Sequence, residues 1–285
     1  MTKRRDFLKT TAAFAAASMV FPMTAFGPEK KVIGLQLYTV RDKIKTDLKG
    51  TLERLAKIGY NSVEAAGYNV ADSTFYGMGI KPFTSLLNDL GMTLNSSHTT
   101  FELDVAEKVI GDAASAGAEY IIYPFLNENF RKNLDGWKAT AEKFNKMGEI
   151  AKQNGIKFGY HNHAFEFDVM ENQVPFDLLL TQTDPSLVTF EMDLYWVTRG
   201  GHNPVDYFKK YPGRFELWHV KDMVKTDDMF FAPVGTGRID FAGIFAEKET
   251  SGMKYFFVEQ DSFKDMDAFD SVETSYKYLS QAKFL

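Results

Sequence analysis

The chain has 285 residues and a formal net charge of −5, with 45% hydrophobic and 25% charged residues. These values are ordinary for a folded globular protein, so they exclude a disordered or fibrous class, and the length suits one large α/β domain. Cysteine is absent, which excludes disulfides, thiolate catalysis and sulfur-ligated metals and leaves nitrogen and oxygen as metal ligands.

The N-terminus has the pattern of an export signal. Arg4 and Arg5 open a basic segment, an uncharged alanine-rich stretch covers 10–27, and charge then returns. This order is typical of a signal peptide, and the Arg-Arg-x-Phe-Leu-Lys string resembles a twin-arginine signal. We expect 1–27 to direct export to the periplasm and to be removed, and the domain to span 28–285. The alternatives are an amphipathic surface helix or a membrane anchor.

Apolar runs and amphipathic segments alternate along the rest of the chain. The apolar runs predict strands at 32–38, 61–66, 92–98, 120–124, 156–166, 187–193, 215–220 and 254–260. The segments between them predict helices at 42–58, 81–90, 103–116, 134–154, 176–181, from 203, 241–250 and 266–282.

Eight strand-then-helix units in succession predict a single (β/α)₈ TIM barrel rather than a doubly wound sheet. No dinucleotide-binding fingerprint is present, because the nearest glycine-rich string, at 235–238, has neither the spacing nor a preceding strand. Catalytic groups of such barrels lie at the carboxyl ends of the strands, so the residues that end each apolar run are the candidates for function.

The last four predicted strands each end in a residue that can bind a metal. These residues are Glu166, Asp193, His219 and Glu259. Neighbouring strand ends converge on the barrel axis, so together they predict a site for one divalent cation. The mixed oxygen and nitrogen ligands favour Mn²⁺, with Co²⁺, Mg²⁺ or Zn²⁺ as alternatives. Taken singly, each carboxylate could equally be a surface or capping group.

Two histidines of the fifth predicted strand, His161 and His163, lie two residues apart and therefore on one face. We expect both to point into the barrel mouth, one as a metal ligand and the other as a general base. Buried histidines with a purely structural role are the alternative. Lys221 follows His219 closely and could stabilise an oxyanion or form an ordinary surface ion pair.

Five further residues are candidates for binding a polyhydroxylated substrate. Three of them end earlier strands, one aromatic residue could offer a flat platform to a sugar face, and one basic residue lies in a late loop: Gln36, Glu64, His98, Trp196 and Arg238. The alternatives are polar groups that satisfy loop backbone, core packing for Trp196, and a loop-fixing role for Arg238.

Four strings of the chain resemble the xylose isomerase-like TIM-barrel superfamily, and more narrowly its exported sugar phosphate isomerase/epimerase-like members. They begin at Gly34 (GLQLYTVRD), Tyr160 (YHNHAFEF), Trp218 (WHVKD) and Val234 (VGTGRIDF). Their order and spacing make a strong joint match over nearly the whole chain after the signal.

The resemblance implies a metal-dependent enzyme in which Asp193, His219 and Glu259 match the family's later metal ligands. Sugar epimerases of the family usually carry a glutamate where His161 stands, and they use it with the last glutamate as a pair of bases. Glu166 is the nearest carboxylate in this chain. Inosose dehydratase-like and 3-keto-glycoside lyase-like relatives have a similar histidine-rich arrangement, and they eliminate a β-group after removing the proton next to a carbonyl.

The sequence therefore predicts an isomerase or epimerase of a sugar or sugar derivative that forms an ene-diolate, with a keto-sugar lyase or dehydratase as the alternative. Because phosphorylated sugars are mainly cytosolic, export favours an unphosphorylated substrate.

Residues 1–27 carry a net charge of +3, so their removal leaves −8. An acidic chain repels polyanions, so we expect no nucleic-acid partner. The oligomeric state stays open, with a homo-oligomer as one option.

Overall fold

Eight parallel strands close into a barrel at the centre of the computed structural model, in the order β1, β13, β10, β9, β8, β7, β6, β2. The structure describes residues 31–285, so the expected signal 1–27 lies outside the described residues. The barrel strands are β1 (Gly34–Gln36), β2 (Ser62–Ala65), β6 (Thr93–His98), β7 (Tyr120–Tyr123), β8 (Lys157–His161), β9 (Val188–Asp193), β10 (Leu217–Val220) and β13 (Tyr255–Val258). Because β1 pairs with both β2 and β13, the predicted (β/α)₈ barrel is confirmed.

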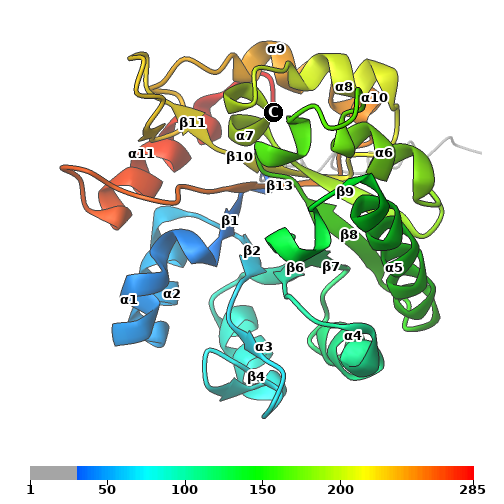
Figure 1. Cartoon of the computed structure of the whole chain (residues 1–285). Coiled ribbons are helices and arrows are strands. Elements are labelled where there is room, and N and C mark those ends of the chain that lie inside the picture. Colours follow the sequence, from blue (N-terminus) through cyan, green and yellow to red (C-terminus); the bar gives the residue numbers. More distant parts are fainter. Residues whose placement is uncertain (1–30) are drawn as a thin grey trace, which may run out of the picture. The chain divides into compact units, whose positions relative to one another are not determined.

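Helices surround the barrel strands (Figure 1). They are α1 (Arg41–Thr46), α2 (Leu48–Ile58), α3 (Ile80–Asp89), α4 (Ala106–Ser115), α5 (Leu134–Gln153), α6 (Pro175–Gln182), α7 (Leu194–Arg199), α8 (Pro204–Lys210), α9 (Phe241–Phe245), α10 (Lys248–Ser251) and α11 (Ala268–Gln281). Among residues 31–285, none of these helices has the length and apolar character needed to cross a bilayer.

Short elements complete the connections between strands and helices. Single 3₁₀ turns are η1 (Leu37–Val40), η2 (Leu103–Val105), η3 (Glu128–Phe130) and η4 (Phe165–Phe167). A small antiparallel sheet follows β2, formed by β3 (Tyr68–Asn69), β4 (Thr74–Phe75) and β5 (Met78–Gly79), and a two-stranded ribbon follows β10, formed by β11 (Asp222–Met223) and β12 (Phe231–Ala232).

Several predicted elements differ from the structure; for example, the helix expected over 241–250 is divided into α9 and α10. The helix expected over 42–58 is interrupted at Asp47, whose backbone is extended and whose side chain accepts a hydrogen bond from the Gly50 amide to begin α2. The strand expected over 156–166 ends at His161, because the Asn162 side chain accepts a hydrogen bond from the Asp193 amide and the chain turns away into η4.

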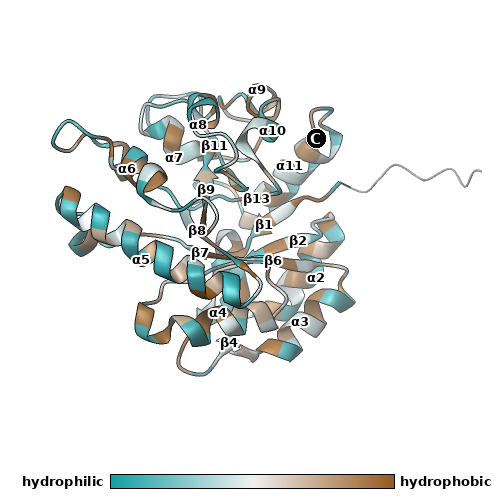
Figure 2. Ribbon diagram, turned by 90° about the vertical axis from the view of Figure 1, so that its right-hand side faces the viewer, coloured by the Kyte–Doolittle hydropathy of each residue, from teal (hydrophilic) through white to brown (hydrophobic). Residues whose placement is uncertain are grey.

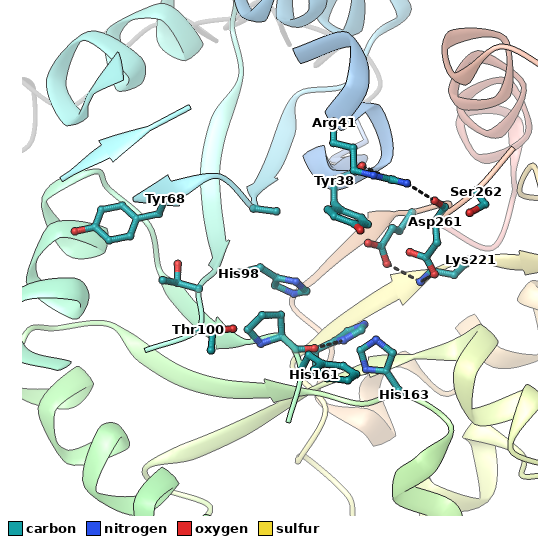
Figure 3. A pocket seen from close by; sticks show the side chains of 15 residues that line it. Tyr38, Arg41, Tyr68, His98, Thr100, His161, His163, Lys221, Asp261 and Ser262 are labelled. Carbon is teal, nitrogen blue, oxygen red and sulfur yellow. Dashed lines mark hydrogen bonds and ion pairs between the residues drawn. The ribbon is translucent and has the colours of Figure 1, made fainter. Parts of the chain in front are cut away.

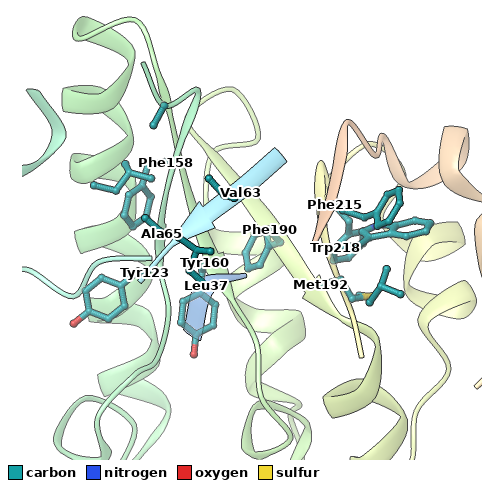
Figure 4. Packing of buried hydrophobic residues seen from close by; sticks show 14 of the residues in the cluster. Leu37, Val63, Ala65, Tyr123, Phe158, Tyr160, Phe190, Met192, Phe215 and Trp218 are labelled. Carbon is teal, nitrogen blue, oxygen red and sulfur yellow. The ribbon is translucent and has the colours of Figure 1, made fainter. Parts of the chain in front are cut away.

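Large apolar side chains fill the space between the strands and the helices. Figure 4 shows outward-facing residues of the strands, such as Phe158, Phe190 and Trp218, within this layer. In Figure 2 the strands at the centre carry brown, hydrophobic residues, whereas helix α5 alternates teal and brown along its length. Burial of this layer supplies the main favourable free energy of folding.

The barrel interior has its own small apolar plug, formed by Tyr120, Ile122, Leu217 and Phe257. Side chains two residues apart on a strand share a face, so the next inward-facing residues lie one layer closer to the carboxyl ends of the strands. Two residues beyond Leu217 and Phe257 stand His219 and Glu259. The plug therefore forms the floor beneath a layer of polar side chains.

We predict that Gly148→Ala in α5 destabilises the protein by about 1–2 kcal/mol, because its Cβ would lie 2.6 Å from the Leu187 carbonyl oxygen. Gly111→Ala in α4 is the matched control, because the atom nearest to its added Cβ would be the Asn154 Oδ1 at 3.5 Å, an ordinary contact distance. Alanine favours a helix over glycine by about 1 kcal/mol, so this variant should gain stability. Urea unfolding measures both; equal effects at the two sites would contradict the predicted close packing of α5.

Candidate metal centre and active site

The carboxyl ends of the barrel strands surround a cavity of about 650 Å³. Its walls come from strand ends and from the loops after β1, β2, β6, β7, β8, β10 and β13. Figure 3 shows the imidazoles of His98, His161 and His163 gathered in this cavity, with Lys221 and Asp261 nearby. The candidate site lies where the barrel fold places catalytic groups.

Four buried side chains at the last strand ends, the upper cluster, converge at the cavity floor: His161, Asp193, His219 and Glu259. One possible ligand atom of each lies within 4.8 Å of the others. The Asp193 Oδ2 atom is 3.3 Å from His161 Nε2, and the Glu259 Oε2 atom is 2.8 Å from His219 Nδ1. Two imidazoles and two carboxylates around one point match the ligands of a divalent cation.

A second group, the lower cluster, shares His219 with the first: Glu64, His98, Glu191 and His219. Glu64 Oε2 is 2.6 Å from His219 Nε2, and it also accepts a hydrogen bond from Gln36 Nε2 at 2.7 Å. Ser96 Oγ donates to the other Glu64 oxygen, and His98 Nε2 lies 2.5 Å from Glu191 Oε2. Most polar atoms of the lower cluster are therefore already satisfied by protein groups.

The contacts of His219 distinguish the two clusters. Its Nε2–H can donate to Glu64, which directs the opposite nitrogen, Nδ1, toward Asp193 and Glu259. A carboxylate that accepts from one ring nitrogen and fixes the other toward a metal is a common arrangement around protein metal ions. His219 Nδ1 and Glu259 Oε2 are buried 2.8 Å from each other without a well-aligned hydrogen bond, and Glu259 Oε2 is also ion-paired with Lys221 Nζ at 2.7 Å. The upper cluster thus fits a metal, and Glu64 supports it from below.

Lys221 adds a buried positive charge to the site. Its Nζ atom lies 2.7 Å from Glu259 Oε2, and 2.9 Å from carboxylate oxygens of both Asp193 and Asp261. Burial alone would lower the pKa of Lys221, but the Asp193 carboxylate and its neighbours raise it well above the usual value. Burial likewise opposes ionisation of Asp193 and Glu259, yet the nearby Lys221 ammonium lowers the pKa of both carboxyls. These groups form a charged network.

Three histidines of the site are held neutral. Burial lowers the pKa of His98 to about 4, although the Glu64 carboxylate opposes the shift. Burial also lowers the pKa of His161, helped by the charge of His219, and burial lowers the pKa of His163 well below the ordinary value. A neutral imidazole has one nitrogen that can accept a proton or bind a metal, so the cavity contains bases as well as an acid.

The structure brings most of the predicted site residues together. Asp193, His219 and Glu259 converge as predicted, and His161 is the fourth member of their cluster. His163, Lys221 and His98 line the cavity. Gln36 and Glu64, predicted to bind substrate, instead lie buried beneath it and do not line it.

Glu166 is not brought to the upper cluster. Its carboxylate accepts hydrogen bonds from the Tyr160 hydroxyl at 2.6 Å and from the His163 amide at 2.9 Å. Burial raises the pKa of Glu166 to about 7. The prediction of Glu166 as a metal ligand depends on a strand that continues to residue 166. Because β8 ends at His161, Glu166 instead lies in the turn after the strand, where its carboxylate binds the His163 amide.

Arg238 and Trp196 also lie away from the cavity. Asp222 accepts hydrogen bonds from the Gly235 and Gly237 amides, which fixes the loop that carries Arg238. Arg238 contacts the Met223 sulfur and lines a separate hollow with His202. Trp196 lines another hollow on the far side of His163.

Two acidic residues of the site were not predicted. Glu191 lies two residues before Asp193 on β9, so the two-residue period of the strand would have placed it on the same inward face. Asp261 follows Glu259 by two residues and contacts Lys221. Burial raises the pKa of Asp261 to about 6, against the opposing effect of the Lys221 charge. Neither residue ends its predicted strand run of 187–193 or 254–260, so the strand-end criterion does not select them.

Comparisons with known proteins agree with the barrel fold. A crystal structure of a sugar phosphate isomerase/epimerase from Parabacteroides distasonis ATCC 8503 is 32% identical, with a TM-score of 0.81, covering 90% of this chain and 95% of that one. A second structure with the same description and organism is 29% identical, with a TM-score of 0.79, covering 89% and 99%. The IolI protein, solved with a zinc atom, is 14% identical with a TM-score of 0.69 over 87% of this chain and 96% of that one, which supports the fold alone.

Among curated relatives, the inosose dehydratase of Clostridium botulinum (strain Alaska E43 / Type E3) is 30% identical over 157 residues, which are 48% of this chain and 52% of the relative. The chain thus spans about half the length of the curated relatives it matches. The model of the xylose isomerase-like TIM barrel family matches residues 52–281, which is most of the chain. The protein therefore belongs to the xylose isomerase-like TIM barrel family.

Proposed function

We propose that the protein is a divalent-metal-dependent isomerase or epimerase that removes the proton next to a carbonyl group of a sugar or sugar derivative. The observation that carries this proposal is the upper cluster, in which ligand atoms of four buried side chains lie within 4.8 Å of one another. Neutral imidazoles and a buried ammonium stand beside it. Metal ligands, a base and an acid are the groups that such a reaction requires.

The metal would be held by the upper cluster, His161, Asp193, His219 and Glu259. Two carboxylate and two imidazole ligands favour Mn²⁺, with Co²⁺, Mg²⁺ and Zn²⁺ as alternatives. When bound, such a cation polarises the substrate carbonyl and makes the neighbouring proton easier to remove.

His163 is the general base in this proposal. It lines the cavity, it stands outside both clusters, and its lowered pKa keeps the imidazole neutral and able to accept a proton. Lys221 is the acid: its raised pKa keeps the ammonium charged, and it lines the same cavity. In isomerisation, His163 takes a proton from one carbon and the acid delivers a proton at the neighbouring carbon. In epimerisation, the acid returns a proton to the same carbon from the opposite face. Transfer of a proton from His163 to Lys221 through solvent restores both groups.

We propose an unphosphorylated substrate. Lys221, the buried basic side chain of the cavity, contacts three carboxylates, so its charge is already balanced and is not available to a phosphate dianion. Export to the periplasm by the twin-arginine route, our proposal from residues 1–27, agrees with this substrate class.

A lyase or dehydratase is the second candidate. It is supported by the resemblance to inosose dehydratases over about half of the chain and by His161, which replaces the carboxylate of two-base epimerases. The first step is shared. In elimination, Lys221 would donate its proton to the departing β-hydroxyl, which leaves as water. Incubation of the Mn²⁺-loaded protein with keto sugars and 3-keto-glycosides distinguishes the outcomes, because elimination creates an absorbing enone and isomerisation does not.

We predict that Asp193→Ala removes the bound metal, which elemental analysis of the purified protein would measure as a loss of nearly the whole equivalent per chain. Glu166→Gln is the matched control, because this buried carboxylate lies outside the upper cluster. It should keep its metal. Metal retained by the Asp193 variant, or lost from the Glu166 variant, would place the ion elsewhere.

Glu64→Gln should weaken metal affinity by about 10- to 100-fold, because the neutral amide is a poorer acceptor for His219 Nε2–H. Ser96→Ala also removes a hydrogen bond from Glu64, but on the other oxygen, so it should have a much smaller effect. Titration against a chelating dye measures both affinities. An affinity of the Glu64 variant equal to that of the natural protein would refute the supporting role of Glu64.

His163→Asn should lower kcat by about 10²–10⁴-fold, because the base of the first step is lost. In D₂O, the natural protein should introduce deuterium at the carbon next to the substrate carbonyl, and the variant should do so far more slowly while keeping its metal. If the variant incorporates deuterium at the same rate as the natural protein, another group of the cavity is the base.

A further inference from the structure

A second hollow, of about 460 Å³, opens beside the cavity that holds the metal cluster. Phe125 and His163 line both spaces. Their rings are nearly perpendicular, with centroids 5.1 Å apart. The two spaces are therefore neighbours that share these two side chains.

The second hollow has the surface chemistry of a ring-binding site. Phe125, Phe165 and Trp196 contribute aromatic walls. Phe165 already has the Arg131 guanidinium 3.8 Å from its ring centre and His163 stacked nearly parallel at a centroid distance of 5.6 Å. Phe125 keeps 39% of its surface exposed in spite of its apolar character. Flat aromatic faces bind other flat, partly apolar rings, including the C–H faces of sugars.

Polar groups at the edge of the same hollow suit hydroxyl groups. Asp168 is exposed there, and Arg199 is held in place because its Nη1 atom donates to the Tyr195 hydroxyl at 3.0 Å. The Arg199 guanidinium also lies 5.8 Å from the centre of the Trp196 ring. Apolar walls with a few fixed polar groups at the edge are typical of small-molecule sites.

We propose that the substrate is a two-ring molecule, in which the reacting sugar lies over the metal cluster and a glycosidic bond links it to a second ring in the hollow of Phe125, Phe165 and Trp196. This inference rests on the proposed function and adds the substrate class to it. A free monosaccharide would fill only the first space and leave the aromatic walls of the second exposed to water. The second ring is either another sugar or an aromatic aglycone, since both present a flat face.

Binding to the Mn²⁺-loaded protein tests the proposal. Calorimetric Kd values would be compared for methyl β-D-glucopyranoside, which has one ring, and for cellobiose and phenyl β-D-glucopyranoside, which have two. We expect at least one two-ring ligand to bind about tenfold more tightly than the one-ring ligand, the gain of one aromatic contact. If cellobiose binds more tightly than phenyl β-D-glucopyranoside, the second ring is a sugar; if the phenyl glucoside binds more tightly, it is an aromatic group.

Two variants locate the gain in the second hollow. Phe165→Ala removes one aromatic wall and Ala164→Leu partly fills the space, and neither residue lines the first cavity. Each should abolish the preference for two rings while changing the one-ring Kd by less than about twofold. Leu103→Ala is the control, because Leu103 is similarly exposed, at 37%, and lines neither space. It should keep the preference.

Equal affinity for one-ring and two-ring ligands, or a preference that survives in both variants, would overturn the two-ring substrate and leave the proposed reaction standing. If the protein holds its metal and binds none of the three ligands, the two-ring substrate is overturned as well.

Discussion

The burial of charge on the barrel axis is the constraint on which the rest of the site depends. Four carboxylates, Glu64, Glu191, Asp193 and Glu259, are almost completely shielded from water, whereas the cationic partners among them are Lys221 and His219. Charged groups removed from water are tolerated only when they are paired or bound to a metal. A divalent cation at the upper cluster would reduce the excess of negative charge, with His219 then neutral and bound through Nδ1, and the same burial keeps His98 and His163 neutral.

The fold produces this concentration of charge through a simple periodicity. Inward-facing side chains alternate along each strand, so an apolar plug around Leu217 and Phe257 is followed one layer higher by His219 and Glu259. Below the upper cluster, Glu64 forms a hydrogen bond with His219 and accepts hydrogen bonds from Gln36 and Ser96. The lower layer therefore sets the orientation of the upper layer, which meets the cavity and the adjoining aromatic hollow.

The barrel and the core of the site could be predicted from the sequence because both depend on local patterns. Alternating strands and helices indicated the fold, and strand-ending residues indicated Asp193, His219 and Glu259. The failures arose where tertiary contacts decide. Asn162 binds the Asp193 amide and ends β8 early, which removes Glu166 from the cluster, and Asp222 holds the loop of Arg238 away from the cavity. The pairing of Glu64 with His219, 155 residues apart, has no local sequence signal.

The most direct test of the account is the position of the metal itself. A crystal of the protein grown with Mn²⁺ and measured by anomalous diffraction should show one strong peak about 2 Å from His219 Nδ1 and from ligand atoms of His161, Asp193 and Glu259. His219 Nε2 should remain hydrogen-bonded to Glu64. A peak among Glu64, His98 and Glu191, or no peak within reach of Asp193 and Glu259, would contradict the account.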